Sequence, residues 1–146
     1  MLKLVLRLFL ALALPGAAAA CAPNGSMPAS APNGSLVSSL QVETTPGSVR
    51  LALQVTNAGS APVPLEFASG QTHDFVVLQG DRELWRWSAD RMFTQALRTE
   101  TLGAGETRTF DATWTPPAGT RGDLVARGFL TARGERAERQ TVFRLP

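Results

Sequence analysis

Residues 48–57 read SVRLALQVTN, and their apolar side chains recur at every second position. Val49, Leu51, Leu53 and Val55 alternate with polar or small residues. Successive side chains of a β-strand point to opposite faces of a sheet, so this spacing places one face of the segment against a core. The segment is therefore predicted to be a half-buried strand.

Similar short apolar segments follow one another from Leu36 onward, separated by turn signals roughly every 8–12 residues. Pro46-Gly47 and Gly80-Asp81 are such turns, whereas Pro62 and Pro64 restrict the strand near them to an edge or a short piece. The pattern predicts an all-β sandwich or barrel, with no helix of useful length. Further strands are expected at residues 40–42, 75–78, 83–87, 124–131 and 141–145, and after Gly103-Ala-Gly105, where Phe110, Ala112 and Trp114 share a face.

The tryptophans of residues 83–87 have two interpretations. Trp85 and Trp87 are two positions apart, so on a strand they share a face. They either pack in the core beside Phe110 and Trp114 or form an aromatic platform for a sugar or peptide. A domain of ~110 residues seldom exposes two such large side chains, which favours the core. The predicted core includes Leu53, Val55, Phe75, Val77, Trp85, Trp87, Phe110 and Trp114.

Residues 88–97 are expected to cross between sheets, with one helical turn for which Ser88 is the N-cap. Met92 and Phe93 are large apolar residues with polar residues on either side. They either close one end of the sandwich as a buried plug or form a surface anchor for a partner. The plug is the preferred interpretation.

Residues 1–20 are predicted to be a cleavable signal peptide. Lys3 and Arg7 make the start of the chain positive, residues 8–14 form a short apolar run, and Ala18-Ala-Ala20 provides the small side chains that a signal peptidase requires. The run is too short to remain as a membrane-spanning anchor. The protein is therefore expected to be exported.

Cys21, the only cysteine, directly follows the predicted cleavage site. Residues 18–21 resemble a bacterial lipobox, although Ala18 stands where a lipobox usually has leucine. Cys21 is either lipidated, which anchors the protein to a membrane, or unmodified, which leaves it periplasmic or secreted. An exposed free thiol is a liability in an oxidising compartment, which favours lipidation. Residues 21–35 contain APNGS twice and are expected to form a tether, with residues 36–146 as the domain.

The charge pattern argues against a nucleic-acid partner. The chain has 14 basic and 12 acidic residues, and cleavage before Cys21 removes Lys3 and Arg7, which makes the two totals equal. Nucleic-acid binding requires clustered basic side chains, whereas these are interspersed with acidic ones. No later segment has the ~20 consecutive apolar residues of a spanning helix. Membrane contact is therefore expected only through a lipid on Cys21.

No catalytic or metal site is expected. His73 is the only histidine and Cys21 the only cysteine, too few for a metal site of nitrogen and sulfur ligands. Ser69, His73 and Asp74 are close in sequence, but neighbours on one segment rarely have the geometry of a catalytic triad. Asp74 or Gln71 is instead expected to satisfy backbone amides in the turn. Neither enzymatic activity nor a cofactor is predicted.

The chain contains, in this order, VTNAG (55–59), LEFASGQTHDF (65–75), LWRWS (84–88), RMFTQAL (91–97), LGAGE (102–106) and Trp114. This order resembles the BsuPI domain family, which is named for an intracellular proteinase inhibitor of Bacillus. The family's pattern is a Ser-Gly-Gln turn, Asp-Phe, a tryptophan-containing strand, Ser, and then Phe-Thr-Gln. The resemblance covers residues 40–145.

The resemblance implies an immunoglobulin-like antiparallel β-sandwich of about seven to nine strands and a proteinase-inhibitor function. The family's namesake acts inside the cell, whereas this chain is expected to be exported, so a cytoplasmic protease is excluded as its target. No catalytic residue carries over. The positions that match the family's motif are Ser69, Gly70, Gln71, Asp74, Trp85, Trp87, Ser88, Phe93 and Gln95.

Two functions remain open at this point. The first is a membrane-tethered inhibitor in the cell envelope, whose protein partner is an envelope or secreted protease. Arg91, Met92, Phe93 and Gln95 are the candidates for contact with that partner, and exposure of residues 91–93 would favour this function. The second is an adhesion or assembly module of the envelope without inhibitory activity, which a buried plug would favour.

Overall fold

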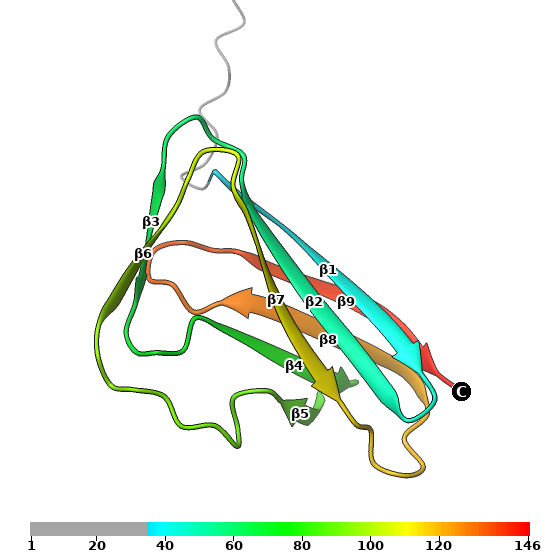
Figure 1. Cartoon of the computed structure of the whole chain (residues 1–146). Helices are drawn as coiled ribbons and strands as arrows, with labels where there is room; N and C mark the ends of the chain where they lie inside the picture. The colour runs from blue at the N-terminus through cyan, green and yellow to red at the C-terminus, as the bar shows by residue number, and fades with distance from the viewer. Residues whose placement is uncertain (1–34) are drawn as a thin grey trace, which may run out of the picture.

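The computed structural model describes residues 35–146, and this part of the chain consists of nine β-strands without a helix (Figure 1). The all-β prediction is therefore confirmed. The expected signal peptide, Cys21 and all but the last residue of the expected tether lie outside the described residues. The strands are β1 (Leu36–Thr45), β2 (Ser48–Asn57), β3 (Val63–Phe67), β4 (His73–Gln79), β5 (Arg82–Arg86), β6 (Arg98–Leu102), β7 (Thr107–Trp114), β8 (Gly122–Leu130) and β9 (Glu138–Leu145).

Two antiparallel sheets form the sandwich. The three-stranded sheet has the order β1-β2-β7, and the four-stranded sheet has the order β5-β4-β8-β9. Figure 1 shows these two layers side by side, with β3 and β6 as a separate two-stranded ribbon next to them. A sheet of three strands packed on a sheet of four is the architecture of an immunoglobulin-like sandwich, as the resemblance implied.

The core lies between the two sheets and follows the alternation of residues 48–57. The four alternating apolar side chains of β2 are all buried, and Leu53 is paired with Leu40 of β1 and Phe110 of β7. The prediction for this segment is confirmed. Of the predicted core residues, Leu53, Val55, Phe75, Val77 and Trp114 are buried, whereas Trp85, Trp87 and Phe110 are half-buried and packed against the core.

β4 is a central strand of the four-stranded sheet, in agreement with its apolar sequence. Phe75 and Val77 belong to the core cluster, and Val76 between them is also buried, on the opposite face of the strand. β4 and β5 are joined through Gly80, whose φ of 58° is a conformation that glycine adopts without strain. The predicted hairpin at Gly80-Asp81 is therefore confirmed.

The β3–β6 ribbon is only half predicted by the sequence. β3 is a five-residue edge strand, as Pro62 and Pro64 indicate, and in the described part of the chain it pairs with β6. β6 has no counterpart among the predicted strands, because residues 98–102 read RTETL and show no apolar alternation. Leu65 and Phe67 of β3 are buried in the core, so the ribbon extends the core beyond the two sheets.

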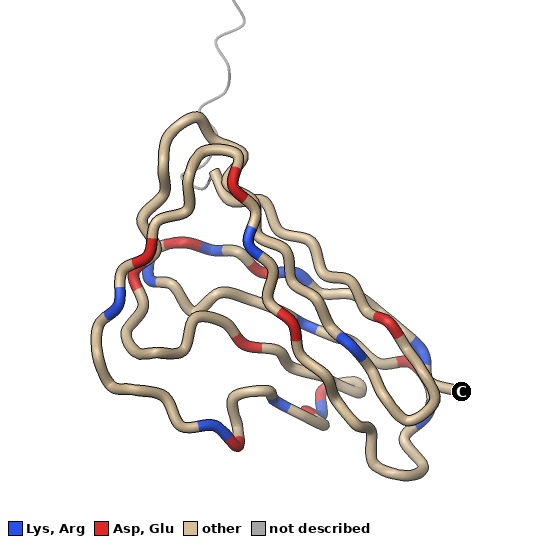
Figure 2. The backbone as a smooth tube through the Cα atoms, viewed as in Figure 1, with Lys and Arg blue, Asp and Glu red and all other residues tan. Residues whose placement is uncertain are grey.

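Acidic and basic residues are interspersed over the described part of the chain (Figure 2). Several form cross-strand ion pairs, such as Arg50 with Asp111 at 2.9 Å and Arg127 with Glu138 at 3.4 Å. These pairs are largely exposed, so each contributes only ~0–1 kcal/mol to stability. Residues 35–146 contain no helix that could cross a membrane.

Candidate functional site

The connection between β5 and β6, residues 87–97, is here called the crossing loop. It leads from the four-stranded sheet to the β3–β6 ribbon along one side of the molecule (Figure 1). Two tight turns open it, in which the Ala89 amide donates to the Arg86 carbonyl and the Arg91 amide to the Ser88 carbonyl, both at 3.2 Å. The expected helical turn is not formed, so that prediction is wrong. Ser88 does not act as an N-cap, because its hydroxyl is used elsewhere.

The crossing loop is attached to the rest of the domain at two residues, here called its anchor points. The first anchor point is Ser88, which is bound by Asp74 of β4. Oδ2 of Asp74 accepts a hydrogen bond from the Ser88 hydroxyl at 2.6 Å, and its Oδ1 accepts one from the Ser88 amide at 3.1 Å. The same carboxylate accepts the Phe75 amide at 2.8 Å and Nη1 of Arg86 at 3.2 Å. The Asp74 side chain is only 4% exposed. A buried carboxylate with four donors fixes Ser88 in one position.

The second anchor point is Thr94, which is bound by the Ser69-Gly70-Gln71 turn. The Gly70 amide donates to the Thr94 carbonyl at 2.9 Å. A Cβ at residue 70 would lie 2.6 Å from the Thr94 hydroxyl oxygen, so any larger residue here would displace the Thr94 side chain. Inside the turn, the Gln71 amide donates to the Ser69 hydroxyl at 3.2 Å. Ser69 therefore satisfies the turn amide that was assigned to Asp74 or Gln71, and Asp74 serves the crossing loop instead.

Between the two anchor points, the inner side of the crossing loop is packed on Trp87. The guanidinium carbon of Arg91 lies 4.2 Å from the centroid of the Trp87 ring, a cation–π contact. Nε of Arg91 also donates to the Trp87 carbonyl at 3.1 Å. The Phe93 ring lies 5.8 Å from the Trp87 ring, centroid to centroid. Arg91 and Phe93 thus both turn back toward the domain.

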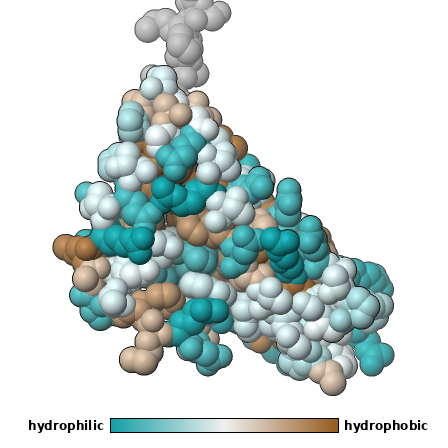
Figure 3. Space-filling view, in the orientation of Figure 1, coloured by the Kyte–Doolittle hydropathy of each residue, from teal (hydrophilic) through white to brown (hydrophobic). Residues whose placement is uncertain are grey.

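Met92 lies between these two residues and turns outward, with an exposed fraction of 100%. Gln95 is also exposed, and its side-chain amide donates to the Phe93 carbonyl at 3.1 Å. Figure 3 shows apolar surface at the lower left of the molecule, over the crossing loop. Met92 is therefore not the buried plug that was preferred. Met92 is exposed, as the surface-anchor interpretation requires, and Phe93 is half-buried.

His73 lies on the inner side of β4, beneath Trp87. Its ring centroid is 4.3 Å from that of Trp87 and 4.7 Å from that of Phe110. Burial lowers the pKa of His73, the charge of Asp74 opposes this shift, and the charge of Arg91 adds to it. The imidazole is therefore neutral at neutral pH, and its Nδ1 is hydrogen-bonded to the Thr72 hydroxyl at 3.0 Å.

His73 and Asp74 do not form a catalytic pair. Adjacent residues of a strand point to opposite faces, and the Asp74 carboxylate is occupied by the donors described above. Trp85 and Trp87 likewise do not form a joint platform. Trp85 stacks on Trp114 with centroids 6.3 Å apart, whereas Trp87 follows the end of β5 and covers His73.

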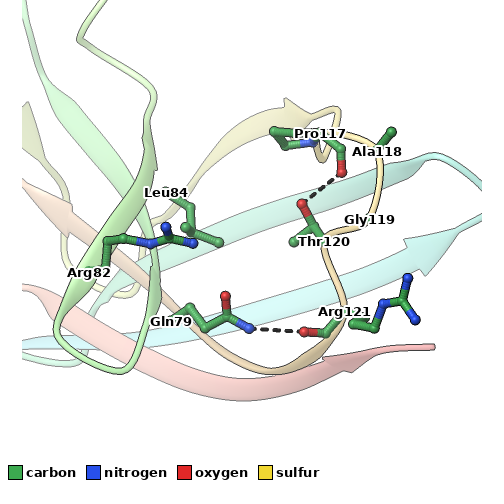
Figure 4. Close-up of a pocket in the computed structure, with 8 residues that line it drawn as sticks. All are labelled: Gln79, Arg82, Leu84, Pro117, Ala118, Gly119, Thr120 and Arg121. Atoms are coloured by element: carbon green, nitrogen blue, oxygen red, sulfur yellow. Dashed lines mark hydrogen bonds between the residues drawn. The ribbon is translucent and has the colours of Figure 1, made fainter.

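A second feature, an open cleft of about 580 Å³, lies between the β4–β5 hairpin and the β7–β8 connection. Figure 4 shows Gln79, Arg82 and Leu84 on one side of it and residues 117–121 on the other. The Gln79 side-chain amide bridges the cleft to the Arg121 carbonyl at 2.9 Å. The lining contains no histidine, cysteine or carboxylate. Over residues 35–146, no three such side chains are grouped as a metal site.

Exposed loops that a scaffold holds in place commonly carry binding or catalytic residues. The profile of the BsuPI family, described as intracellular proteinase inhibitor, matches residues 36–135. The chain therefore belongs to the BsuPI family, as the motif order indicated. A family of proteinase inhibitors is not catalytic, in agreement with the interpretation of the sequence.

Solved structures resemble the chain only weakly. Sporulation control protein Spo0M from Bacillus subtilis is 18% identical, with a TM-score of 0.46 over 77% of this chain and 49% of that one. A β-glucosidase from Bifidobacterium adolescentis is 15% identical, with a TM-score of 0.41 over 75% of this chain and 17% of that one. This chain thus spans at most about half of these structures. No curated protein matches its sequence.

The structure gathers most of the family's motif positions around the crossing loop. Ser69, Gly70 and Gln71 build the second anchor point, Asp74 and Ser88 build the first, and Trp87, Phe93 and Gln95 belong to the crossing loop itself. Trp85 is separate, stacked on Trp114. Two contributors were missed: Arg86, which pairs with Asp74 as well as with its sequence neighbour Glu83, and Thr94, which acts through its backbone carbonyl.

Proposed function

We propose that this protein is a proteinase inhibitor that binds its target through the crossing loop. The observation that carries the proposal is the exposure of Met92 at 100% in a loop that is held at Ser88 and Thr94. A loop that is already ordered loses little conformational entropy when it binds, which favours affinity. Membership of the BsuPI family supports a protease as the partner.

The alternative function, adhesion or assembly without inhibition, was tied to a buried plug at residues 91–93. Met92 and Arg91 are instead exposed, although Arg91 also contacts Trp87. This exposure favours the inhibitor.

The purified mature chain, from Cys21 to the C-terminus, is expected to slow at least one secreted or envelope protease at micromolar concentration. The measurement is the initial rate of peptide-substrate cleavage by chymotrypsin-type, subtilisin-type, trypsin-type and metalloproteases, with increasing inhibitor. Heat-unfolded protein serves as the control. If every rate is unchanged and a non-protease envelope protein co-purifies with the chain, the assembly function replaces this proposal.

We further propose that the protein is exported and held at a membrane by lipid on Cys21. The signal-like residues 1–20 and the adjacent cysteine support this location. The target would then be an envelope or secreted protease, unlike that of an intracellular inhibitor. Residues 21–35 would act as the tether, and a flexible chain of that length spans roughly 20 Å.

Cys21→Ser is expected to move the protein from the membrane fraction to the soluble fraction. Each buried methylene contributes ~0.8 kcal/mol to membrane binding, and two acyl chains anchor a protein stably where one does not. The measurements are membrane fractionation and mass spectrometry of the mature N-terminus. An unacylated Cys21 in a soluble wild-type product would contradict the anchor and leave a periplasmic or secreted protein.

A further inference from the structure

We infer that Met92 enters the primary specificity pocket of the target, and that the target is an endopeptidase whose pocket is apolar. This inference rests on the proposed inhibitor function and specifies its partner. Chymotrypsin-type proteases have such a pocket, whereas trypsin-type proteases carry a carboxylate in it and select Arg or Lys. Arg91 directly precedes Met92, so a trypsin-type protease that binds Arg91 in its pocket is the alternative target.

The contacts of Arg91 argue against that alternative. Its guanidinium lies 4.2 Å from the centroid of the Trp87 ring, and its Nε donates to the Trp87 carbonyl at 3.1 Å. To enter a deep pocket, the Arg91 side chain would have to leave the ring and give up this hydrogen bond. Arg91 therefore supports the shape of the loop from inside.

Phe93 is excluded for a similar reason. Its ring is 5.8 Å from the ring of Trp87, and its carbonyl accepts the side-chain amide of Gln95 at 3.1 Å. The ring is half-buried, so docking in a pocket would require it to detach from the domain. Phe93 and Arg91 thus flank Met92 from both sides and turn in the opposite direction.

Leu97 is the other large exposed apolar residue of the crossing loop, at 78%. It lies beyond the second anchor point at Thr94 and directly before β6. Met92 is the large apolar side chain that lies between the two anchor points and is free of the domain. Its unbranched, flexible thioether is suited to a narrow apolar pocket.

The test measures inhibition constants of the mature chain against chymotrypsin, subtilisin and trypsin. The wild type is expected to inhibit one or both of the first two and not trypsin. Met92→Asp should weaken that inhibition by at least ~100-fold, because a charge is placed in an apolar pocket. Met92→Leu should stay within ~10-fold of the wild type. Met92→Arg should create inhibition of trypsin.

Two controls keep the results interpretable. Leu97→Asp adds the same charge to an exposed apolar position outside the anchor points, and it should leave inhibition unchanged. Thermal unfolding should be the same for the wild type and the variants of Met92 and Leu97, because neither side chain is packed in the core. A loss of inhibition without a change in unfolding then reports on the contact with the protease.

The possible outcomes separate the inference from the proposed function. Inhibition that Met92→Asp leaves unchanged overturns the role of Met92 but keeps the inhibitor. Inhibition of trypsin by the wild type, lost in Arg91→Ala, overturns the choice of Met92 over Arg91. If no protease in the wider panel is inhibited by the wild type, both the proposed function and this inference fail.

Discussion

Replacing Asp74 with alanine is expected to lower the free energy of unfolding by ~3–5 kcal/mol, because each buried donor that loses its acceptor costs ~1–3 kcal/mol. The substitution leaves the Ser88 amide and hydroxyl and the Phe75 amide without their acceptor, whereas Arg86 keeps its ion pair with Glu83 at 2.7 Å. The first anchor point of the crossing loop is lost with it. The measurement is urea unfolding followed by tryptophan fluorescence.

Ser88→Ala is the matched control for this prediction. It removes one hydroxyl donor to Asp74 but keeps the backbone amide contact and the Arg86 ion pair, so a loss of only ~1 kcal/mol is expected. A loss below ~1 kcal/mol in Asp74→Ala would show that water replaces its partners, and that the loop is not held there.

Trp114→Ala is expected to destabilise the domain by ~3–5 kcal/mol, as large-to-small substitutions in a core usually do. Trp114 ends β7, is 3% exposed and stacks on Trp85 of β5, with ring centroids 6.3 Å apart. Its loss therefore opens a cavity and removes a contact between the two sheets. The measurement is the midpoint and slope of chemical unfolding.

Trp85→Ala should cost less than Trp114→Ala, because Trp85 is half-buried and solvent can reach the vacated space. The double substitution separates packing from stacking, since an aromatic pair adds ~0.5–1.5 kcal/mol beyond the area that it buries. If Trp85→Ala and Trp114→Ala lower the free energy of unfolding equally, the expected effect of their different burial is contradicted. Trp85 would then contribute to the core as much as Trp114.

The strands that line the core could be predicted because apolar alternation is a local property. In residues 48–57 every second side chain is apolar, and each of these is buried in β2. β4 was recognisable as a central strand for the same reason. β6 escaped prediction because only its last residue, Leu102, is buried, so residues 98–102 show no period. Its strand form depends on pairing with β3.

The positions of the candidate site could be predicted through the family's motif, but their roles could not. Asp74 was expected to serve its own turn, yet it holds Ser88, 14 residues away. Gly70 meets Thr94, a contact that exists only when the crossing loop folds back over the turn. Such pairings depend on the approach of distant segments, for which a single sequence carries no periodic signal.

The sequence by itself determined the sandwich, its main core strands and the family, since these follow from local periodicity and motif order. It named Arg91, Met92, Phe93 and Gln95 as candidates for contact with a partner without ranking them. The tertiary structure distinguishes them, because Arg91 and Phe93 contact Trp87 whereas Met92 is fully exposed. The physical reason is that the direction of a loop side chain is set by what lies beneath the loop, here Trp87 stacked on His73.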